Sequence, residues 1–285
     1  MRLVFLTTLA LTGFAANSLL TRAAISGGHL DAWTFMLVRL VTGAAMLALL
    51  LGLRRTPARS PGAPRRGRGS WPMTMWLAGY AVLFTLAYVR IEAAPGALLL
   101  FGSVQLTMFA AALWRGETLS PVHWTGVVLA LAGFLVLTGP GLTAPDTVGA
   151  GLMAGSGMCW GAYSLAGRQA RDPLGVTADN FLRASSVVIV AALAAGMTGP
   201  FSARGFVLAS ASGAVASGLA YAAWYSVLPI LPVWRAATVQ LTVPMLTALG
   251  AAVFLSEALT PRLAVAMTLV IAGIWMTRAG AKPPG

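Results

Sequence analysis

Long apolar runs recur from one end of the chain to the other, each long enough to cross a bilayer as a helix, which takes about 20 residues. Only helices and closed barrels can satisfy every backbone polar group inside a membrane. Barrel strands would alternate apolar and polar residues, and no such pattern dominates here. Only 9% of the residues are charged and the mean hydropathy is +0.81. The sequence therefore predicts an all-α polytopic membrane protein.

The apolar runs predict ten transmembrane helices. Their expected bounds are 3–25, 30–53, 71–90, 94–115, 121–139, 147–170, 175–198, 204–228, 232–256 and 260–279. Most connections between them are short. The exception is 54–70, which contains six arginines together with Pro and Gly. We expect a cytoplasmic surface loop there, and contact with anionic lipid headgroups is a second role left open.

Positive charge predicts the orientation. A cytoplasmic N-terminus leaves 13 Lys and Arg residues on the cytoplasmic side and 4 on the other, with two more inside spans. The positive-inside rule therefore places both termini in the cytoplasm. The same rule explains the net charge of +12, so we expect no nucleic-acid partner. The first run could imitate a signal peptide, but its repetition later in the chain favours a span of the mature protein.

Two pairs of segments repeat. Residues 14–22 (F-A-A-N-S-L-L-T-R) match residues 160–168 (W-G-A-Y-S-L-A-G-R) at an offset of 146. Residues 116–121 (G-E-T-L-S-P) match residues 256–261 (S-E-A-L-T-P) at an offset of 140, and an Ala-Gly pair follows each Pro eleven residues later. Each half holds five spans, and an odd number forces the second half to enter the membrane from the opposite side. We therefore predict two inverted repeats, 1–140 and 141–285, around a central cavity, as in secondary transporters.

The doubled E-x-L-[ST]-P motif and the five-plus-five arrangement resemble the EamA-type drug/metabolite transporters. The aromatic-rich first and sixth spans are most similar to the YddG-type amino-acid exporters of the bacterial inner membrane. This resemblance implies that spans 1, 3, 4, 6, 8 and 9 surround a cavity. Spans 2 and 7 would support them, and spans 5 and 10 would lie at the periphery. It also implies export of aromatic and other neutral amino acids.

Buried polar groups are the first candidates for substrate contacts, because an amide in hydrocarbon needs a partner or water. Asn17, Gln105 and Gln240 lie near the middle of spans 1, 4 and 9. They could bind an amino or carboxyl group without being charged. Hydrogen bonding between helices is the alternative.

Aromatic side chains are the second group of candidates. Trp160 and Tyr163 share one helical face, and Tyr221 begins a similar set in span 8. Tyr80 in span 3 is comparably deep. A belt at the membrane interface is the alternative for such residues. The predicted substrate-binding residues are Phe14, Asn17, Tyr80, Gln105, Trp160, Tyr163, Tyr221 and Gln240.

Two arginines lie inside predicted spans. Arg39 and Arg183 are about eight residues from the starts of spans 2 and 7. Asp179 precedes Arg183 by four residues and can pair with it along the helix, whereas no such acid precedes Arg39. We expect both side chains to snorkel towards the headgroups. Binding of a substrate carboxylate is the alternative. On span 6, Gly151, Gly155, Gly157 and Gly161 have the spacing of close helix contacts.

No Asp, Glu or His lies in the middle of a predicted span. The small multidrug antiporters, which the repeat resembles at a distance, depend on a buried Glu in their first helix. We therefore predict a facilitative exporter of neutral or aromatic amino acids rather than a carboxylate-based proton antiporter. Other small metabolites or drugs are the alternative cargo. The same absence, and a single Cys, predict no enzyme activity, no metal and no cofactor. Membrane lipids and a small-molecule substrate are the expected partners of a monomer.

Overall fold

The computed structural model describes residues 1–54, 68–114, 116, 120–141, 144–168, 170, 172–195, 199–228, 230–231 and 239–279. Within these ranges the secondary structure is helical, apart from an isolated antiparallel bridge between Leu30 and Phe201. The all-α prediction is therefore confirmed. Glu117 and Leu119 of the first E-x-L motif, and residues 55–67 of the arginine-rich loop, lie outside the described residues.

The described helices follow the predicted spans. The first are α1 (Arg2–Ser26), α2 (Ala32–Leu53), α3 (Trp71–Arg90), α4 (Ala93–Trp114) and α5 (Pro121–Thr138). They are followed by α6 (Thr147–Gly167), α7 (Pro173–Ala195), α8 (Ala203–Gly213), η1 (Ala214–Leu219), α9 (Ala220–Val227), α11 (Thr242–Phe254) and α12 (Pro261–Ala279). The segment η1 is a π-helix that joins α8 and α9 into one continuous run. Such π segments are frequent at functional sites.

Carboxylates set where several helices begin. Asp31 accepts hydrogen bonds from the backbone nitrogens of Trp33 and Thr34, each at 3.0 Å, at the start of α2. Asp146 accepts one from the backbone nitrogen of Gly149 at 2.7 Å, at the start of α6. These contacts satisfy N–H groups that have no partner within the helix. Both acids therefore stabilise helix ends and lie away from mid-span.

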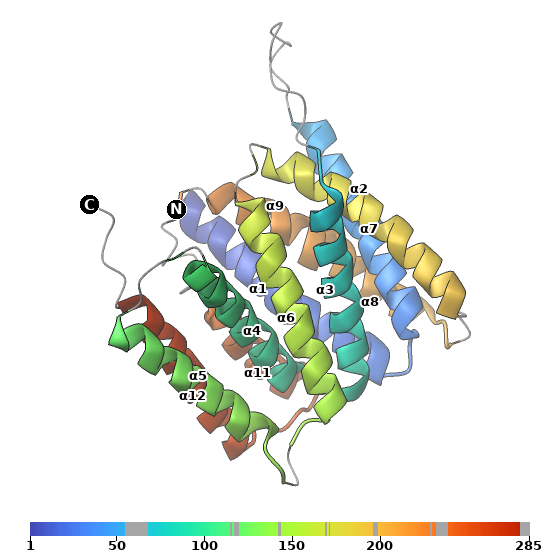
Figure 1. Cartoon of the computed structure of the whole chain (residues 1–285). Helices are drawn as coiled ribbons and strands as arrows, with labels where there is room; N and C mark the ends of the chain where they lie inside the picture. Colours follow the sequence, from blue (N-terminus) through green and yellow to red (C-terminus); the bar gives the residue numbers. More distant parts are fainter. Residues whose placement is uncertain are drawn as a thin grey trace, which may run out of the picture.

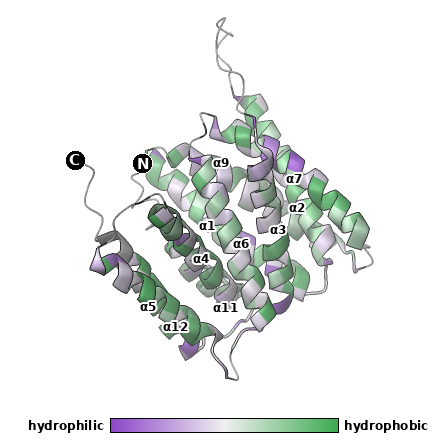
Figure 2. Cartoon of the chain, in the orientation of Figure 1, coloured by the Kyte–Doolittle hydropathy of each residue, from purple (hydrophilic) through white to green (hydrophobic). Residues whose placement is uncertain are grey.

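Apolar side chains face outwards on many helices. Leu135, Val253 and Phe254 are 72%, 73% and 78% exposed, and Figure 2 shows hydrophobic residues along the outer helices. Seven helical runs within the described ranges are long and apolar enough to cross a membrane, and α11 and the apolar part of α12 are shorter. Lipid tails make such an outer surface favourable. The chain is a multi-pass membrane protein.

The helices form a central group with a peripheral pair (Figure 1). Helix α6 packs against α3 and α4, and α1 packs against α9 and α11. Helix α2 packs against α7, α8 and η1 on one side of this group. Helices α5 and α12 pack mainly against each other at the edge of the bundle. The positions of α2, α7, α5 and α12 agree with what the family resemblance implies.

Close packing of α6 depends on some of its glycines. A Cβ atom on Gly157 would lie 2.5 Å from the carbonyl oxygen of Leu100, and one on Gly161 would lie 2.9 Å from Thr107. Both contacts are with α4, so these two glycines allow the helices to approach closely. Gly151 has no heavy atom of another residue within 4 Å of the same position. The prediction of a close contact at Gly151 is wrong, because this glycine faces open space.

Candidate functional site

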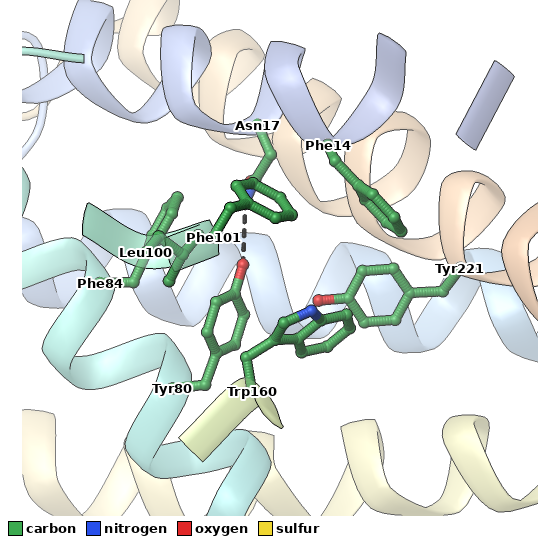
Figure 3. Close-up of a pocket in the computed structure, with 8 residues that line it drawn as sticks. All are labelled: Phe14, Asn17, Tyr80, Phe84, Leu100, Phe101, Trp160 and Tyr221. Atoms are coloured by element: carbon green, nitrogen blue, oxygen red, sulfur yellow. Dashed lines mark hydrogen bonds between the residues drawn. The ribbon is translucent and has the colours of Figure 1, made fainter. Parts of the chain in front are cut away.

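A pocket lies in the middle of the bundle, between α1, α3, α4, α6 and α9 (Figure 3). The space inside it that a water-sized molecule could occupy is only about 10 Å³, so the lining side chains nearly fill the pocket in this conformation. Its lining residues are Phe14, Asn17, Tyr80, Phe84, Leu100, Phe101, Trp160 and Tyr221. Five of the eight predicted site residues are in this set: Phe14, Asn17, Tyr80, Trp160 and Tyr221. Substrate binding by them stays a prediction.

The pocket wall is mostly aromatic. The ring of Trp160 lies 5.1 Å from that of Tyr80 and 4.9 Å from that of Tyr221, both tilted. The ring of Phe14 meets that of Tyr221 edge-on at 5.7 Å. Such geometries are favourable for aromatic pairs beyond their buried area. The wall offers faces and edges to an apolar or aromatic side chain.

Asn17 connects three helices at the pocket. Its Nδ2 donates a hydrogen bond to the Tyr80 hydroxyl at 3.2 Å, and its Oδ1 accepts one from the Ser212 hydroxyl at 2.7 Å. The side chain is 4% exposed. Asn17 therefore makes hydrogen bonds between helices and also lines the pocket, so both interpretations of this residue agree with its position.

Arg39 lies directly behind the pocket wall. Its Nη2 donates to the Tyr80 hydroxyl at 3.0 Å, and its Nε donates to the Ser217 hydroxyl of η1 at 3.2 Å. Its guanidinium carbon is 5.3 Å from the ring centre of Tyr80 and 4.9 Å from that of Phe84. The residue is only 1% exposed. The prediction that Arg39 snorkels is wrong, because its side chain points into the bundle rather than along the helix towards the headgroups.

The charge of Arg39 has no carboxylate partner among the described residues, and its Nη1 makes no hydrogen bond with them. An unpaired buried charge is costly, and cation–π contacts offset only part of that cost. Arg183 is different. It pairs with Asp179 at 2.8 Å and remains partly exposed, so the predicted pair along α7 is confirmed.

Three predicted site residues lie outside the pocket lining. Tyr163 is fully buried and stacks on Trp160, with ring centres 5.6 Å apart. Gln240 is 4% exposed, and Gln105 is partly buried on α4. The Tyr163 hydroxyl and the Nε2 atom of Gln105 are buried without a hydrogen-bond partner among the described residues. Tyr163 supports the pocket wall from behind.

Sequence reasoning missed three lining residues and two supporting serines. Phe84 follows Tyr80 by one helical turn, and that spacing could have revealed it. Leu100 and Phe101 lie in a uniformly apolar run that carries no such signal. Ser212 and Ser217 contact Asn17 and Arg39 from α8 and η1. These two serines could not be identified from the sequence, because their contacts depend on which helices pack against α1 and α2.

The pocket lining contains no Asp, Glu or His. Within the described ranges, no group of three His, Cys, Asp or Glu side chains could hold a metal ion. The polar groups of the lining are neutral hydroxyl, amide and indole groups. Such groups can bind a ligand through neutral hydrogen bonds and aromatic contacts.

A second polar cluster holds one end of the bundle together. Glu257 accepts hydrogen bonds from the backbone nitrogens of Ala93, at 2.8 and 2.9 Å, and Ala94, at 3.3 Å, at the start of α4. Its carboxylate lies 3.5 Å from Arg22 Nε of α1. Burial raises the pKa of this carboxyl, and the two N–H groups oppose that rise. The second E-x-L motif thus links α1, α4 and the segment before α12.

Comparisons with known proteins agree with this architecture. Residues 147–279 match the EamA-like transporter family. An uncharacterised protein of Pseudomonas aeruginosa is 48% identical over 273 residues, which cover 96% of this chain and 93% of that protein. The threonine/homoserine exporter RhtA of Escherichia coli K12 is 31% identical over 157 residues, 53% of each chain. RhtA of Salmonella typhimurium matches to the same extent.

A solved crystal structure has the same fold. It superposes with a TM-score of 0.68 over 96% of this chain and 98% of the other, at 23% identity. The likeness extends over both halves of the chain. It therefore supports the fold of the whole bundle, including the part before residue 147 that the family match does not cover.

Proposed function

Because this chain belongs to the EamA-like transporter family, we propose that it is a secondary exporter of neutral and aromatic amino acids that works by alternating access. The observation that carries the proposal is the pocket in the middle of the bundle. It combines aromatic walls with the neutral polar groups of Asn17, Tyr80 and Tyr221, and it lacks acidic side chains. Such a lining suits a molecule with a polar head and an apolar side chain.

The similarity to RhtA supports a small amino acid as cargo. RhtA is named a threonine/homoserine exporter, and about half of this chain aligns with about half of it. Threonine and homoserine are neutral overall at pH 7, as are phenylalanine and tryptophan. The aromatic lining leads us to place aromatic amino acids, as in the YddG-type exporters, first among the cargoes.

The packing supports two inverted repeats. In the proposed repeat α1 corresponds to α6, α2 to α7, and α3 to the run α8–η1–α9. Helix α6 packs against α3, and α1 packs correspondingly against α8, η1 and α9. Helix α2 packs against α8 and η1, and α7 packs correspondingly against α3. The helix contacts of one half are thus repeated in the other half. A bundle with this symmetry can open to either side of the membrane with similar helix movements, as alternating access requires.

Transport down the gradient of the cargo is the proposed mode. A proton-coupled cycle usually needs a buried group that titrates, and the pocket lining has none near neutral pH. The exporter would lie in the bacterial inner membrane with both termini in the cytoplasm, as the distribution of Lys and Arg indicates. We propose that it works as a monomer.

Transport by purified protein tests the proposal. The protein is reconstituted into liposomes loaded with unlabelled phenylalanine, and uptake of labelled phenylalanine, tryptophan or threonine is measured by counterflow. We expect saturable exchange without an imposed proton gradient. Empty liposomes and a Trp160→Ala variant serve as controls, and the variant should discriminate less well between phenylalanine and threonine.

Two outcomes would change the proposal. Folded protein that exchanges none of the three amino acids contradicts amino-acid export and leaves other small metabolites or drugs as cargo. Exchange that occurs only with a proton gradient contradicts the facilitative mode but not the cargo.

A further inference from the structure

The unpaired charge of Arg39 is the feature that the neutral pocket does not explain. The guanidinium is buried, has no carboxylate partner among the described residues, and leaves Nη1 without a hydrogen bond there. Every acidic side chain that the structure describes lies away from Arg39. Asp31 and Asp146 are at helix starts, Asp172 is with Arg54, Asp179 with Arg183, Glu257 with Arg22, and Glu92 is just before α4. An anion that enters the pocket would supply the missing counter-charge.

Tyr80 provides the connection between Arg39 and the pocket. Its hydroxyl accepts one hydrogen bond from Arg39 Nη2 and another from Asn17 Nδ2. A hydroxyl group has two lone pairs and one proton, so both lone pairs are engaged and the proton remains to be donated. A hydrogen bond from the neighbouring guanidinium also polarises this hydroxyl and strengthens it as a donor.

Tyr221 offers a second donor to the same space. Its hydroxyl is buried and makes no hydrogen bond of good geometry with the described residues, although it lies close enough to the Tyr80 hydroxyl for the two groups to interact. Figure 3 shows the hydroxyls of Tyr80 and Tyr221 and the indole nitrogen of Trp160 directed towards the middle of the lining residues. Two hydroxyl donors and a buried cation favour an acceptor that is negatively charged.

We infer that the Tyr80 and Tyr221 hydroxyls form a subsite for the carboxylate of the cargo, and that Arg39 is a positioning residue which holds Tyr80 and supplies the positive charge. The cargo must then carry a carboxylate, whatever its side chain. This inference rests on the proposed function, because it takes the pocket as the cargo site. It adds that amino-acid amides and simple amines bind more weakly than the corresponding carboxylates.

Ligand binding to purified protein in detergent tests the subsite without any transport step. Three probes share the phenyl group: phenylalanine, phenylpropionate, which has a carboxylate and no amine, and phenylalaninamide, which has an amine and no carboxylate. Binding is followed as the rise in thermal midpoint with probe concentration. We expect the first two probes to bind the wild type. The amide should bind at least about tenfold more weakly than either of them.

Variants at Arg39 distinguish positioning from a purely structural role. Arg39→Gln should reduce the preference for phenylpropionate over the amide about tenfold or more, because the charge is lost. Arg39→Lys keeps the charge and should retain most of the preference, although its ammonium cannot match the guanidinium geometry. Arg183→Gln is the matched control, since it removes a partly exposed arginine of α7 that has its own acid. It should leave the preference unchanged.

The outcomes separate the inference from the proposed function. A wild-type preference for carboxylates that Arg39→Gln preserves overturns the inference, and so does an equal loss in Arg183→Gln. If Arg39→Gln does not fold, loss of the preference in folded Arg39→Lys also counts against it, because the charge is still present there. Carboxylate binding that depends on Arg39, together with no amino-acid exchange in liposomes, would overturn the proposed function and leave the subsite standing.

Discussion

Arg39 and Arg183 lie at comparable depths in α2 and α7, and their surroundings differ in almost every respect. Arg39 is 1% exposed and donates only to the neutral hydroxyls of Tyr80 and Ser217. Arg183 has a side chain that is 27% exposed, an acid at 2.8 Å and the exposed ring of Trp71 at 5.5 Å. The same residue type therefore serves two purposes. One arginine is held unpaired next to the pocket, and the other stabilises the surface of its helix.

This difference shows where the proposed symmetry ends. The pairing of α2 with α7 fits two equivalent halves, but only α2 carries a charge into the middle of the bundle. Asp179 on α7 has no counterpart on α2, where position 35 is the buried Phe35. In the proposed repeat, the two copies would thus share an architecture while one of them acquires the polar site.

The largest effect is expected where α8 touches α2 beside Arg39. In Gly213→Leu, the new Cβ would overlap the carbonyl oxygen of Arg39 and the Thr42 hydroxyl. The helices must separate, at a cost of about 1–3 kcal/mol or more, and Ser217 would move away from Arg39. Thermal unfolding in detergent measures the loss. Gly151→Leu is the control, because nothing lies within 4 Å of its Cβ position. Equal midpoints for the two variants would contradict the close packing of α2 and α8.

The next effect compares the aromatic partners of the two arginines. Tyr80→Phe removes the acceptor shared by Arg39 and Asn17 and should destabilise the protein by about 1–3 kcal/mol, because two buried donors lose their partner. Trp71→Phe leaves a ring near the exposed side of Arg183 and should cost about 0.5–1 kcal/mol or less. Thermal or denaturant unfolding of both variants checks the order. A larger loss for Trp71→Phe than for Tyr80→Phe would show that the contacts of Arg183 on α7 matter more for stability than those of Arg39.

A third variant would make the two arginines alike. Ser217→Asp puts a carboxylate where the hydroxyl now accepts from Arg39 Nε at 3.2 Å. The new acid should pair with Arg39 and weaken phenylpropionate binding about tenfold, since the charge is no longer free. In the control variant Ser217→Asn, the new side chain is nearly the same size as Asp but carries no charge. This variant should weaken phenylpropionate binding much less. Equal binding by the two variants would mean that charge at this position has no influence on the pocket.

The pair on α7 should matter little. Asp179→Asn removes a partly exposed ion pair worth about 0.2–1 kcal/mol, and the new side chain can still accept the hydrogen bond from the Gly69 backbone nitrogen. The change in thermal midpoint should be small and should disappear at high salt, because salt screens exposed pairs. A large loss that persists at high salt would show that Arg183 is as critical as Arg39.

The smallest effect concerns Glu257, whose charge is also partly buried. Its pKa is raised above the ordinary 4.5, mainly by burial, while Arg22 and the N–H groups of Ala93 and Ala94 lower it and Glu92 raises it. The folded state therefore binds the proton more tightly than the unfolded state does. Protonated Glu257 therefore contributes to the free energy of unfolding at low pH, and this contribution is lost as the pH rises from 4.5 through the folded pKa. Glu257→Gln should flatten the pH dependence of the thermal midpoint in that range, and an unchanged slope would contradict the raised pKa.

Much of the fold could be predicted because hydropathy is local. With α8, η1 and α9 taken as one run, the described helices begin and end within three residues of the predicted spans, apart from the start of the ninth span, which lies outside the described residues. Depth along a helix also follows from sequence, and it identified Phe14, Asn17, Tyr80, Trp160 and Tyr221 as central. Leu100 and Phe101 could not be singled out, because residues 93–102 of α4 carry no polar side chain and no pattern shows which face meets the pocket.

The sequence by itself determined the membrane helices, the repeated motifs and the depth of each polar group, because all three depend on neighbours along the chain. Only the tertiary structure decided which side chains meet. Arg39 becomes a buried, unpaired charge because Ser217, 178 positions away, and Tyr80 cover its face of α2. A lipid-facing helix and a pocket-facing helix have almost the same composition in a membrane, so the packing partners settle the role of each residue.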